Sequence, residues 1–322
     1  MAFSGQGVRK TRAPWRHITK GIHMKTQQLG QFTIDRVTEY EGSFAPLKNI
    51  LPGITQADID AHADWLKPNY VDEQDRAVMS FHSYLIQTGR HRILVDACVG
   101  NDKERPHRAS WNRAQFPFMQ SLAQAGVSPQ DIDFVCCTHM HADHVGWNTR
   151  LQNGQWVPTF PNARYVFAQT EYSHWEKTHR EALAKGDPSP NHGSFADSVL
   201  PVVDAGRALM VKDDFEFEPG LYLGAAHGHT PGNCVLHAHS QGRRAIFSGD
   251  ILHTPAQLIN TDWSSNFCFD PQTSAQVRKN LVHTIADTDT LLMTGHFPTP
   301  VAGRVVSHGD HFRFAGADQT AT

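Results

Sequence analysis

Segment 138–144 has the sequence Thr-His-Met-His-Ala-Asp-His and holds three histidines and one aspartate close together. It comes directly after the apolar segment 134–137, which is typical of a buried strand. Alternate residues of an extended chain face the same way, so the first two histidines can point to one side together. Imidazole nitrogens and carboxylate oxygens are ligands that zinc and similar divalent ions accept. The candidate ligands are His139, His141, Asp143 and His144.

A His-rich surface loop is the alternative interpretation, because the chain has 21 His. Ligand-type residues at other strand ends argue against it, since rigid elements hold the geometry of a site best. His229 lies in a tight Gly-His-Thr-Pro-Gly turn. Asp250 follows the strand-like run 245–248 and a glycine, and His296 follows the run 291–294 and a glycine. We therefore expect all of these residues to form one metal site.

The order His-x-His-x-Asp-His, then His, Asp and His at strand ends, resembles the metallo-β-lactamase-fold hydrolases over about residues 30–305. The long interval from His144 to His229, and the aspartate at position 143, are most similar to the branch of methyl parathion hydrolase-type phosphotriesterases and acyl-homoserine-lactone lactonases. The resemblance implies an α/β (α+β) sandwich of the αββα type, in which two mixed β-sheets pack together and helices cover their outer faces.

The resemblance also implies a binuclear centre. One divalent metal ion would be bound by His139, His141 and His229, and the second by Asp143, His144 and His296, while Asp250 would bridge the two. Ions in two-metal sites lie roughly 3.5–4 Å apart, which one carboxylate can span. Zn²⁺ is the first expectation for both ions, with Mn²⁺, Co²⁺ and Fe²⁺ as alternatives.

Such a centre predicts hydrolysis. Two cations lower the pKa of a shared water toward ~7, so a hydroxide bridging the metals is available to attack at neutral pH. We expect an ester, lactone or phosphotriester bond of a small, apolar substrate to be cleaved. Catalytic roles are expected for Asp143, Asp250 and His253. His253 stands where the resembling lactonases commonly have a tyrosine that contacts the substrate, and a surface histidine is its alternative interpretation.

Other functions stay open at this point. A glyoxalase II-like thioesterase would use the same ligand set, although no basic cluster for a glutathione moiety is evident. A non-haem iron oxidoreductase similar to persulfide dioxygenases is the redox alternative. A true β-lactamase and a non-catalytic module stapled by metal fit the ligand pattern less well.

Residues around the candidate ligands have expected roles, each with an alternative. Asp96, at the end of the segment 92–96, is expected to accept a hydrogen bond from a ligand histidine, or else to cap a turn. Aromatic residues near the strand ends could line an apolar pocket, although aromatic residues at helical spacing are more often part of a core. These pocket candidates are Trp111, Phe116, Trp147, Trp175 and Phe195, with Phe118 beside them.

Composition and net charge narrow the classes of partner and the cellular location that we expect. The net charge of −3 gives no electrostatic reason to expect nucleic acid or an anionic membrane, so a small-molecule substrate is expected. No apolar run reaches the ~18 residues that a membrane span needs and no secretory signal is evident, which favours a cytoplasmic protein. The five Cys are odd in number and sit mostly in apolar runs, which indicates reduced thiols. The family resemblance alone makes a homodimer plausible.

Residues 1–28 are predicted to be a basic N-terminal extension, with Met24 as the native start or residues 1–23 as a loosely attached arm, and a transit peptide as the weaker alternative. Residues 29–322 are predicted to be a single catalytic domain. Within it, alternating and apolar runs predict strands, and amphipathic or capped runs predict helices. The strands are 32–37, 83–88, 92–96, 163–168, 209–211, 221–223, 234–239, 245–248 and 291–294; the helices are 55–65, 116–125, 170–180 and 271–286; and 185–201 is a loop that could act as a lid.

Overall fold

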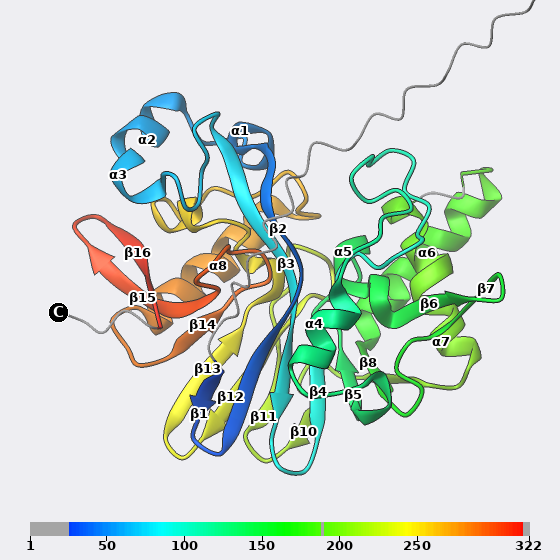
Figure 1. Ribbon diagram of the computed structural model, residues 1–322. Helices are drawn as coiled ribbons and strands as arrows, with labels where there is room; N and C mark the ends of the chain where they lie inside the picture. Colours follow the sequence, from blue (N-terminus) through cyan, green and yellow to red (C-terminus); the bar gives the residue numbers. More distant parts are fainter. Residues whose placement is uncertain (1–25, 188–189, 318–322) are drawn as a thin grey trace, which may run out of the picture.

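Two β-sheets packed face to face form the centre of the computed structural model, which describes residues 26–187 and 190–317 (Figure 1). The predicted extension, 1–28, therefore lies outside the described residues except for its last three positions. Two of these, Gln27 and Gln28, already belong to the first strand, so the predicted domain boundary falls inside an element of the sheet.

The first sheet has seven strands in the order β1-β2-β3-β4-β5-β8-β9. Strands β1 to β4 are antiparallel neighbours, whereas β4, β5, β8 and β9 run parallel to one another. The carboxyl ends of these parallel strands consequently meet at one edge. The bounds are β1 Gln27–Leu29, β2 Phe32–Pro46, β3 Arg76–Gln87, β4 Arg92–Val95, β5 Phe134–Cys136, β8 Arg164–Ala168 and β9 Ala208–Val211.

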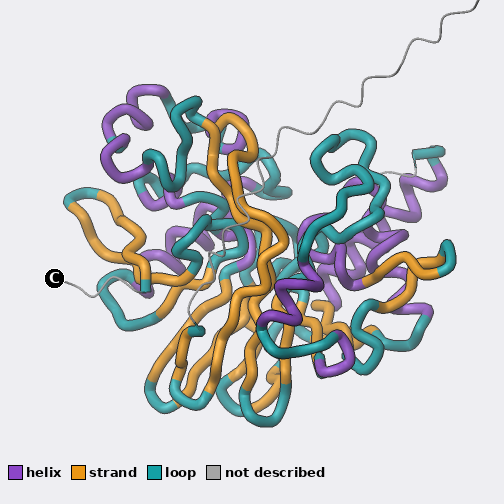
Figure 2. The backbone as a smooth tube through the Cα atoms, viewed as in Figure 1, coloured by secondary structure: helices purple, strands orange, loops and turns teal. Residues whose placement is uncertain are grey.

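The second sheet also has seven strands, in the order β10 to β16, and one parallel pair, β13 with β14. Its other neighbours are antiparallel. The bounds are β10 Glu216–Glu218, β11 Leu221–Ala225, β12 Cys234–Ser240, β13 Arg243–Phe247, β14 Leu291–Met293, β15 Ala302–His308 and β16 His311–Gly316. A separate hairpin, β6 (Thr149–Gln152) with β7 (Gln155–Pro158), projects to one side in Figure 2.

The main hydrophobic core fills the space between the two sheets. Ile34, Tyr84 and Ile93 of the first sheet pack with Leu236 and Phe247 of the second, and all five are buried. These residues alternate with outward-facing ones along their strands, as the period of a half-buried strand requires. Each such side chain contributes roughly 1.5–3 kcal/mol when it is fully buried.

Helices cover the outer faces of both sheets. Helices α4 (Phe118–Gln124), α6 (Gln169–Ala184) and α7 (Leu200–Asp204) pack on the first sheet, and α8 (Pro271–Ile285) packs on the second through Val282 and Ile285. Asp270 caps α8 by accepting hydrogen bonds from the amides of Gln272 and Thr273, both at 3.1 Å. The αββα sandwich predicted from the sequence is therefore confirmed.

Several local predictions are wrong in detail. The helix expected over 55–65 is two short helices, α2 (Gln56–Ala61) and α3 (Ala63–Leu66), and it is preceded by α1 (Leu47–Ile50). The loop expected over 185–201 contains helical turns at Pro190–Gly193 and Phe195–Val199 and the start of α7, because Phe195 and Val199 are buried against the first sheet's helices. The strand β2 is also longer than predicted.

The five cysteines form no disulfide, and all except Cys268 are buried, as the sequence predicts. Among the residues that the structure describes, no helix has both the length and the apolar character needed to cross a membrane.

Candidate metal centre

The ligand-type residues predicted from the sequence converge at the ends of strands from both sheets. His139 and His141 follow β5, and α5 (Ala142–Val145) then carries Asp143 and His144. His229 lies in the turn between β11 and β12, Asp250 in a 3-10 turn (Gly249–Ile251) after β13, and His296 after β14. The side chains form two groups, within each of which the ligand-type atoms lie within 4.8 Å of one another; the groups are His139, His141, His229 and Asp250, and Asp143, His144 and His296.

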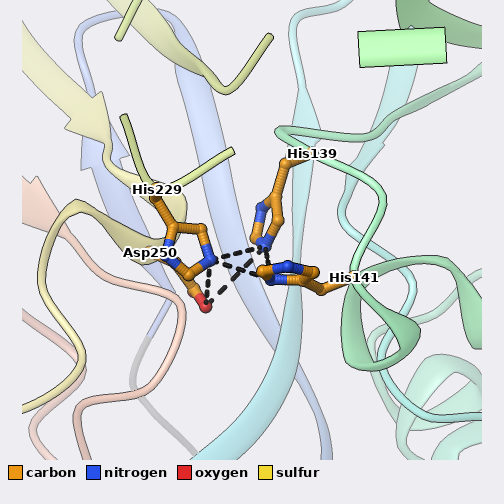
Figure 3. A group of neighbouring side chains, drawn as sticks. All are labelled: His139, His141, His229 and Asp250. Carbon is orange, nitrogen blue, oxygen red and sulfur yellow. Dashed lines mark hydrogen bonds and ion pairs between the residues drawn. The ribbon is translucent and has the colours of Figure 1, made fainter. Parts of the chain in front are cut away.

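The first group is drawn in Figure 3, where three imidazole rings and one carboxylate point toward a common centre. Nε2 of His229 lies 3.2 Å from Nε2 of His139 and 2.9 Å from Nδ1 of His141. Nε2 of His139 lies 3.1 Å from Nδ1 of His141. Oδ2 of Asp250 lies 3.3 Å from Nε2 of His229 and 3.7 Å from Nε2 of His139. Four donor atoms from three separate segments thus face one point.

The other oxygen of Asp250 faces the second group. Its Oδ1 lies 3.1 Å from Nε2 of His144 and 3.2 Å from Nε2 of His296. These two histidine nitrogens are 3.2 Å apart, and Oδ2 of Asp143 is 3.6 Å from Nε2 of His296. One carboxylate therefore presents one oxygen to each group.

These residues fit a pair of divalent cations. Each imidazole nitrogen is either a proton donor or a lone-pair acceptor, so among the three mutually close nitrogens of the first group at least one pair must be like against like. Oδ1 of Asp250 is buried and makes no hydrogen bond of normal geometry, although two histidine nitrogens are near it. A buried carboxylate oxygen without a partner is costly, and a cation in each group would satisfy both these features.

The electrostatics of the groups agree with this reading. Burial, followed by neighbouring histidines, holds the pKa of His139 and His141 well below the ordinary value, so both are neutral, which is the form that binds metal. Burial opposes protonation of His229, but its hydrogen bond to Asp250, the neighbouring Cys268 and the charge of Asp250 together outweigh burial and raise the pKa of His229 to about 9. The raised pKa of His229 beside Asp250 indicates that the site lacks positive charge to balance the carboxylate.

Further side chains fix the orientation of the histidines. Oδ2 of Asp96 lies 2.9 Å from Nδ1 of His144, the contact that the sequence predicts, and its Oδ1 accepts a hydrogen bond from the amide of Thr138 at 2.7 Å. This arrangement turns Nε2 of His144 toward Asp250. Nδ1 of His296 lies 3.1 Å from the carbonyl oxygen of Ser80, and Nδ1 of His229 lies 3.6 Å from Sγ of Cys268.

Sequence reasoning missed two residues that hold the ligand segments. Glu171, buried in the first turn of α6, accepts hydrogen bonds from the backbone amides of Met140 and Gly232, each at 2.9 Å. Asn191 donates to the carbonyl of Met140 at 2.6 Å and accepts from the amide of Ala142 at 3.1 Å, and so brackets His141. No local pattern marks either residue, because each acts on a segment remote in sequence.

A cavity of about 190 Å³ opens beside the two groups. His253 is buried in its wall rather than on the surface, with Nε2 at 3.2 Å from Oδ2 of Asp250. Trp111 and Trp175 line the cavity, among the predicted pocket residues. The complete lining is Phe44, Met79, Phe81, Arg108, Trp111, His141, Ala142, Asp143, Trp175, Asn191, His192, Asp250, His253, Phe267 and His296.

The other three pocket candidates do not line this cavity and pack elsewhere. Phe116 stacks on Tyr40, with ring centroids 4.9 Å apart. Trp147 stacks on Phe118 and donates a hydrogen bond from Nε1 to Glu39 at 2.7 Å. Phe195 is buried among side chains of the helical layer. These rings pack against other side chains of the protein instead, as most aromatic residues do.

Fold and site together define the class of protein. The family model of the Metallo-beta-lactamase superfamily matches residues 81–296, which is more than half of the chain. The chain therefore belongs to this superfamily, and its described residues include two groups of ligand-type side chains that could hold metal ions.

Particular relatives agree with this class. N-acyl homoserine lactonase AiiA of Bacillus thuringiensis subsp. kurstaki is 24% identical over 179 residues, which are 54% of this chain and 60% of that protein. The structure of AidC, a dizinc quorum-quenching lactonase, has a TM-score of 0.73 at 21% identity, covering 92% of this chain and 98% of that one. The structure of the hydrolase AbOPH has a TM-score of 0.74 at 22% identity, with the same coverage. The segment that matches the curated lactonase AiiA therefore covers about three fifths of the length of that protein.

Proposed function

We propose that this chain is a binuclear metal-dependent hydrolase that cleaves an ester, lactone or phosphotriester bond of a small substrate. Esters and lactones are the preferred candidates among these bonds. The observation that carries the proposal is the placement of Asp250, whose two carboxylate oxygens face two separate groups of ligand-type atoms. The lactonases among the similar proteins support the ester and lactone class.

The chain's own residues divide the work as follows. His139, His141 and His229 would hold one divalent ion, Asp143, His144 and His296 the other, and Asp250 would touch both. When bound, two such cations lower the pKa of a shared water and polarise the oxygen of the bond to be cleaved. Asp250 holds the two ligand groups in register, and Asp96 and Glu171 keep the histidines in place before substrate arrives.

His253 would contact the substrate directly. Its Nδ1 is buried without a hydrogen-bond partner, while its Nε2 lies against Asp250 and 3.3 Å from Oγ of Ser265. Burial lowers the pKa of His253 to about 4, so the ring is neutral and one nitrogen can serve a substrate oxygen. Phe81, Trp111 and Trp175 give the same cavity aromatic walls.

The proposal is tested by metal analysis of the purified protein together with a panel of lactones, aryl esters, thioesters, β-lactams and phosphotriesters. We expect hydrolysis of an ester or lactone that a chelator abolishes and Zn²⁺, Mn²⁺ or Co²⁺ restores. Iron as the only metal, with oxygen consumption and no hydrolysis, would favour the redox alternative instead, and turnover of thioesters alone would favour a thioesterase.

A further inference from the structure

Arg108 places a guanidinium group on the wall of the candidate active-site cavity. Its Cζ lies 4.8 Å from the ring centroid of Phe44 and 4.8 Å from that of Trp111, so the guanidinium lies against two aromatic rings. Cation–π contacts at such distances are attractive. Such contacts do not consume the N–H donors of the guanidinium, which can still bind a ligand.

That edge is not used by the protein. Within residues 26–187 and 190–317, no carboxylate lies within 4.0 Å of the Arg108 guanidinium, and the group makes no side-chain hydrogen bond. Arg105, one turn earlier, differs sharply: it is fully buried, and its NH1 and NH2 donate to the two carboxylate oxygens of Asp197 at 2.6 and 3.0 Å. The neighbouring Arg113 is paired with Glu104. Arg108 alone of these three keeps its donors available.

The charge of Arg108 is also unbalanced within the cavity. The other charged residues in the described lining are Asp143 and Asp250, and both belong to the groups assigned to the metal ions. With their charge taken up there, the guanidinium is the remaining charged group of the lining, and it attracts an oppositely charged ligand that enters the cavity.

Arg108 lines the same cavity as Asp143, Asp250 and His296 of the metal groups, so one small molecule can reach both. Trp111, on which it stacks, is 5.9 Å from the ring of Phe81, and Phe81 is 4.8 Å from the ring of His296, a candidate ligand. The cavity volume of about 190 Å³ is below the roughly 300–1,000 Å³ of most ligand pockets. A substrate whose scissile bond lies at the metal groups therefore places its other end near Arg108.

We propose that Arg108 binds a carboxylate of the substrate through both edge nitrogens, so that the preferred substrates are small esters or lactones that also carry a carboxylate. This inference rests on the proposed hydrolase function and adds the substrate class to it. Two parallel N–H···O bonds to a carboxylate give geometric selection as well as affinity.

The test compares two esters of nearly the same shape, 4-acetoxybenzoate and 4-acetoxybenzamide, with the metal-loaded wild type, Arg108→Met and Arg108→Lys. Hydrogen bonds to a charged group contribute roughly 1.5–3 kcal/mol, so Arg108→Met should lower kcat/KM for the benzoate roughly ten- to a hundredfold and change the benzamide about twofold or less. Arg108→Lys should recover part of the benzoate activity. Arg90→Met, which removes the same charge from an exposed turn, is the matched control and should change neither ester.

The inference is overturned if Arg108→Met lowers kcat/KM equally for both esters, or if the wild type has the same kcat/KM for the benzoate as for the benzamide. Binding of 4-hydroxybenzoate and 4-hydroxybenzamide, measured by calorimetry with the same variants, separates this inference from the hydrolase function. If neither ester is cleaved, the proposed function fails, yet selective binding of the benzoate by the wild type and not by Arg108→Met still supports the Arg108 site. Equal binding of the two phenols rejects it.

Discussion

The side chain of Glu171 accepts a hydrogen bond from the backbone amide of Met140 at 2.9 Å, and Met140 separates the two candidate ligands His139 and His141. The other carboxylate oxygen of Glu171 accepts from Oγ1 of Thr230 at 2.7 Å, directly after His229. One buried carboxylate in α6 therefore ties together the two segments that supply three imidazoles to the first ligand group.

Replacing Glu171 with Gln should weaken metal binding without removing a ligand. An amide places N–H groups against donors that now meet carboxylate oxygens, so the segments around Met140 and Thr230 would separate. We expect the apparent affinity for Zn²⁺ to fall roughly 10- to 100-fold, measured by competition with a chromophoric chelator. Glu181→Gln, an exposed change on the same helix, should leave the affinity unchanged. Equal affinities for both variants would contradict this role.

Asp96→Asn should affect the second ligand group in particular. Asp96 contacts Nδ1 of His144 and accepts from the amide and hydroxyl of Thr138, so the amide would lose negative charge behind the histidine and one acceptor position. We expect the more weakly bound metal equivalent to be lost first, with affinity reduced roughly 10- to 100-fold. A stepwise chelator titration monitored by metal analysis measures this; retention of both equivalents at wild-type affinity would argue against it.

Gly146 should not tolerate a side chain. A Cβ built at this position would lie 1.8 Å from the carbonyl oxygen of Val99, because the segment after α5 packs directly on the loop after β4. Gly146→Ala should therefore lower the free energy of unfolding by about 1–3 kcal/mol or more, through displaced backbone. Urea denaturation measures the loss, and Gly42→Ala, which meets nothing within 4 Å, is the control. A wild-type midpoint for Gly146→Ala would refute the contact.

Lys103 predicts a pH dependence of stability away from the metal centre. Burial lowers the pKa of Lys103 to about 7, an effect that nearby Asp197 partly offsets, whereas an unfolded lysine has a pKa of roughly 10.4. Between these values the unfolded chain holds more protons than the folded one, so this residue makes the free energy of unfolding rise with pH. Lys103→Met should flatten that rise between about pH 7.5 and 9.5.

The measurement is a series of urea midpoints across that pH range. Lys212→Met removes an exposed lysine and should keep the wild-type slope. If Lys103→Met has the same slope as the wild type, Lys103 is protonated to the same extent in both states.

The sequence predicted those parts of the molecule that local residue patterns determine. Strand ends such as those before Asp250 and His296 are marked by a short apolar run and a glycine, and the structure brings both residues into the candidate centre. The hairpin of β3 and β4 and the helix α8 also follow from alternation and capping. The layered fold was predicted because the order of the ligand-type residues resembles that of the metallo-β-lactamase-fold hydrolases.

The cavity wall could not be predicted in the same way. Phe44 and Phe81 lie in the long strands β2 and β3, and Arg108 lies in an irregular segment, so only tertiary packing brings them beside Trp111. Trp147 was expected near the site because it lies close to the strand ends that carry the ligands, but its ring stacks on Phe118 of the helical layer. Sequence distance from a ligand says little about which way a side chain points.

The central claim is that Asp250 joins two metal positions that act together in hydrolysis. The most direct measurement is an activity titration of metal-free protein with Zn²⁺, using a hydrolysed ester or lactone, alongside metal content per chain for the wild type and Asp250→Asn. We predict that activity rises up to two equivalents per chain, and that Asp250→Asn loses at least one equivalent and most activity. Saturation of the wild type at one equivalent, or a fully metallated and fully active Asp250→Asn variant, would contradict the claim.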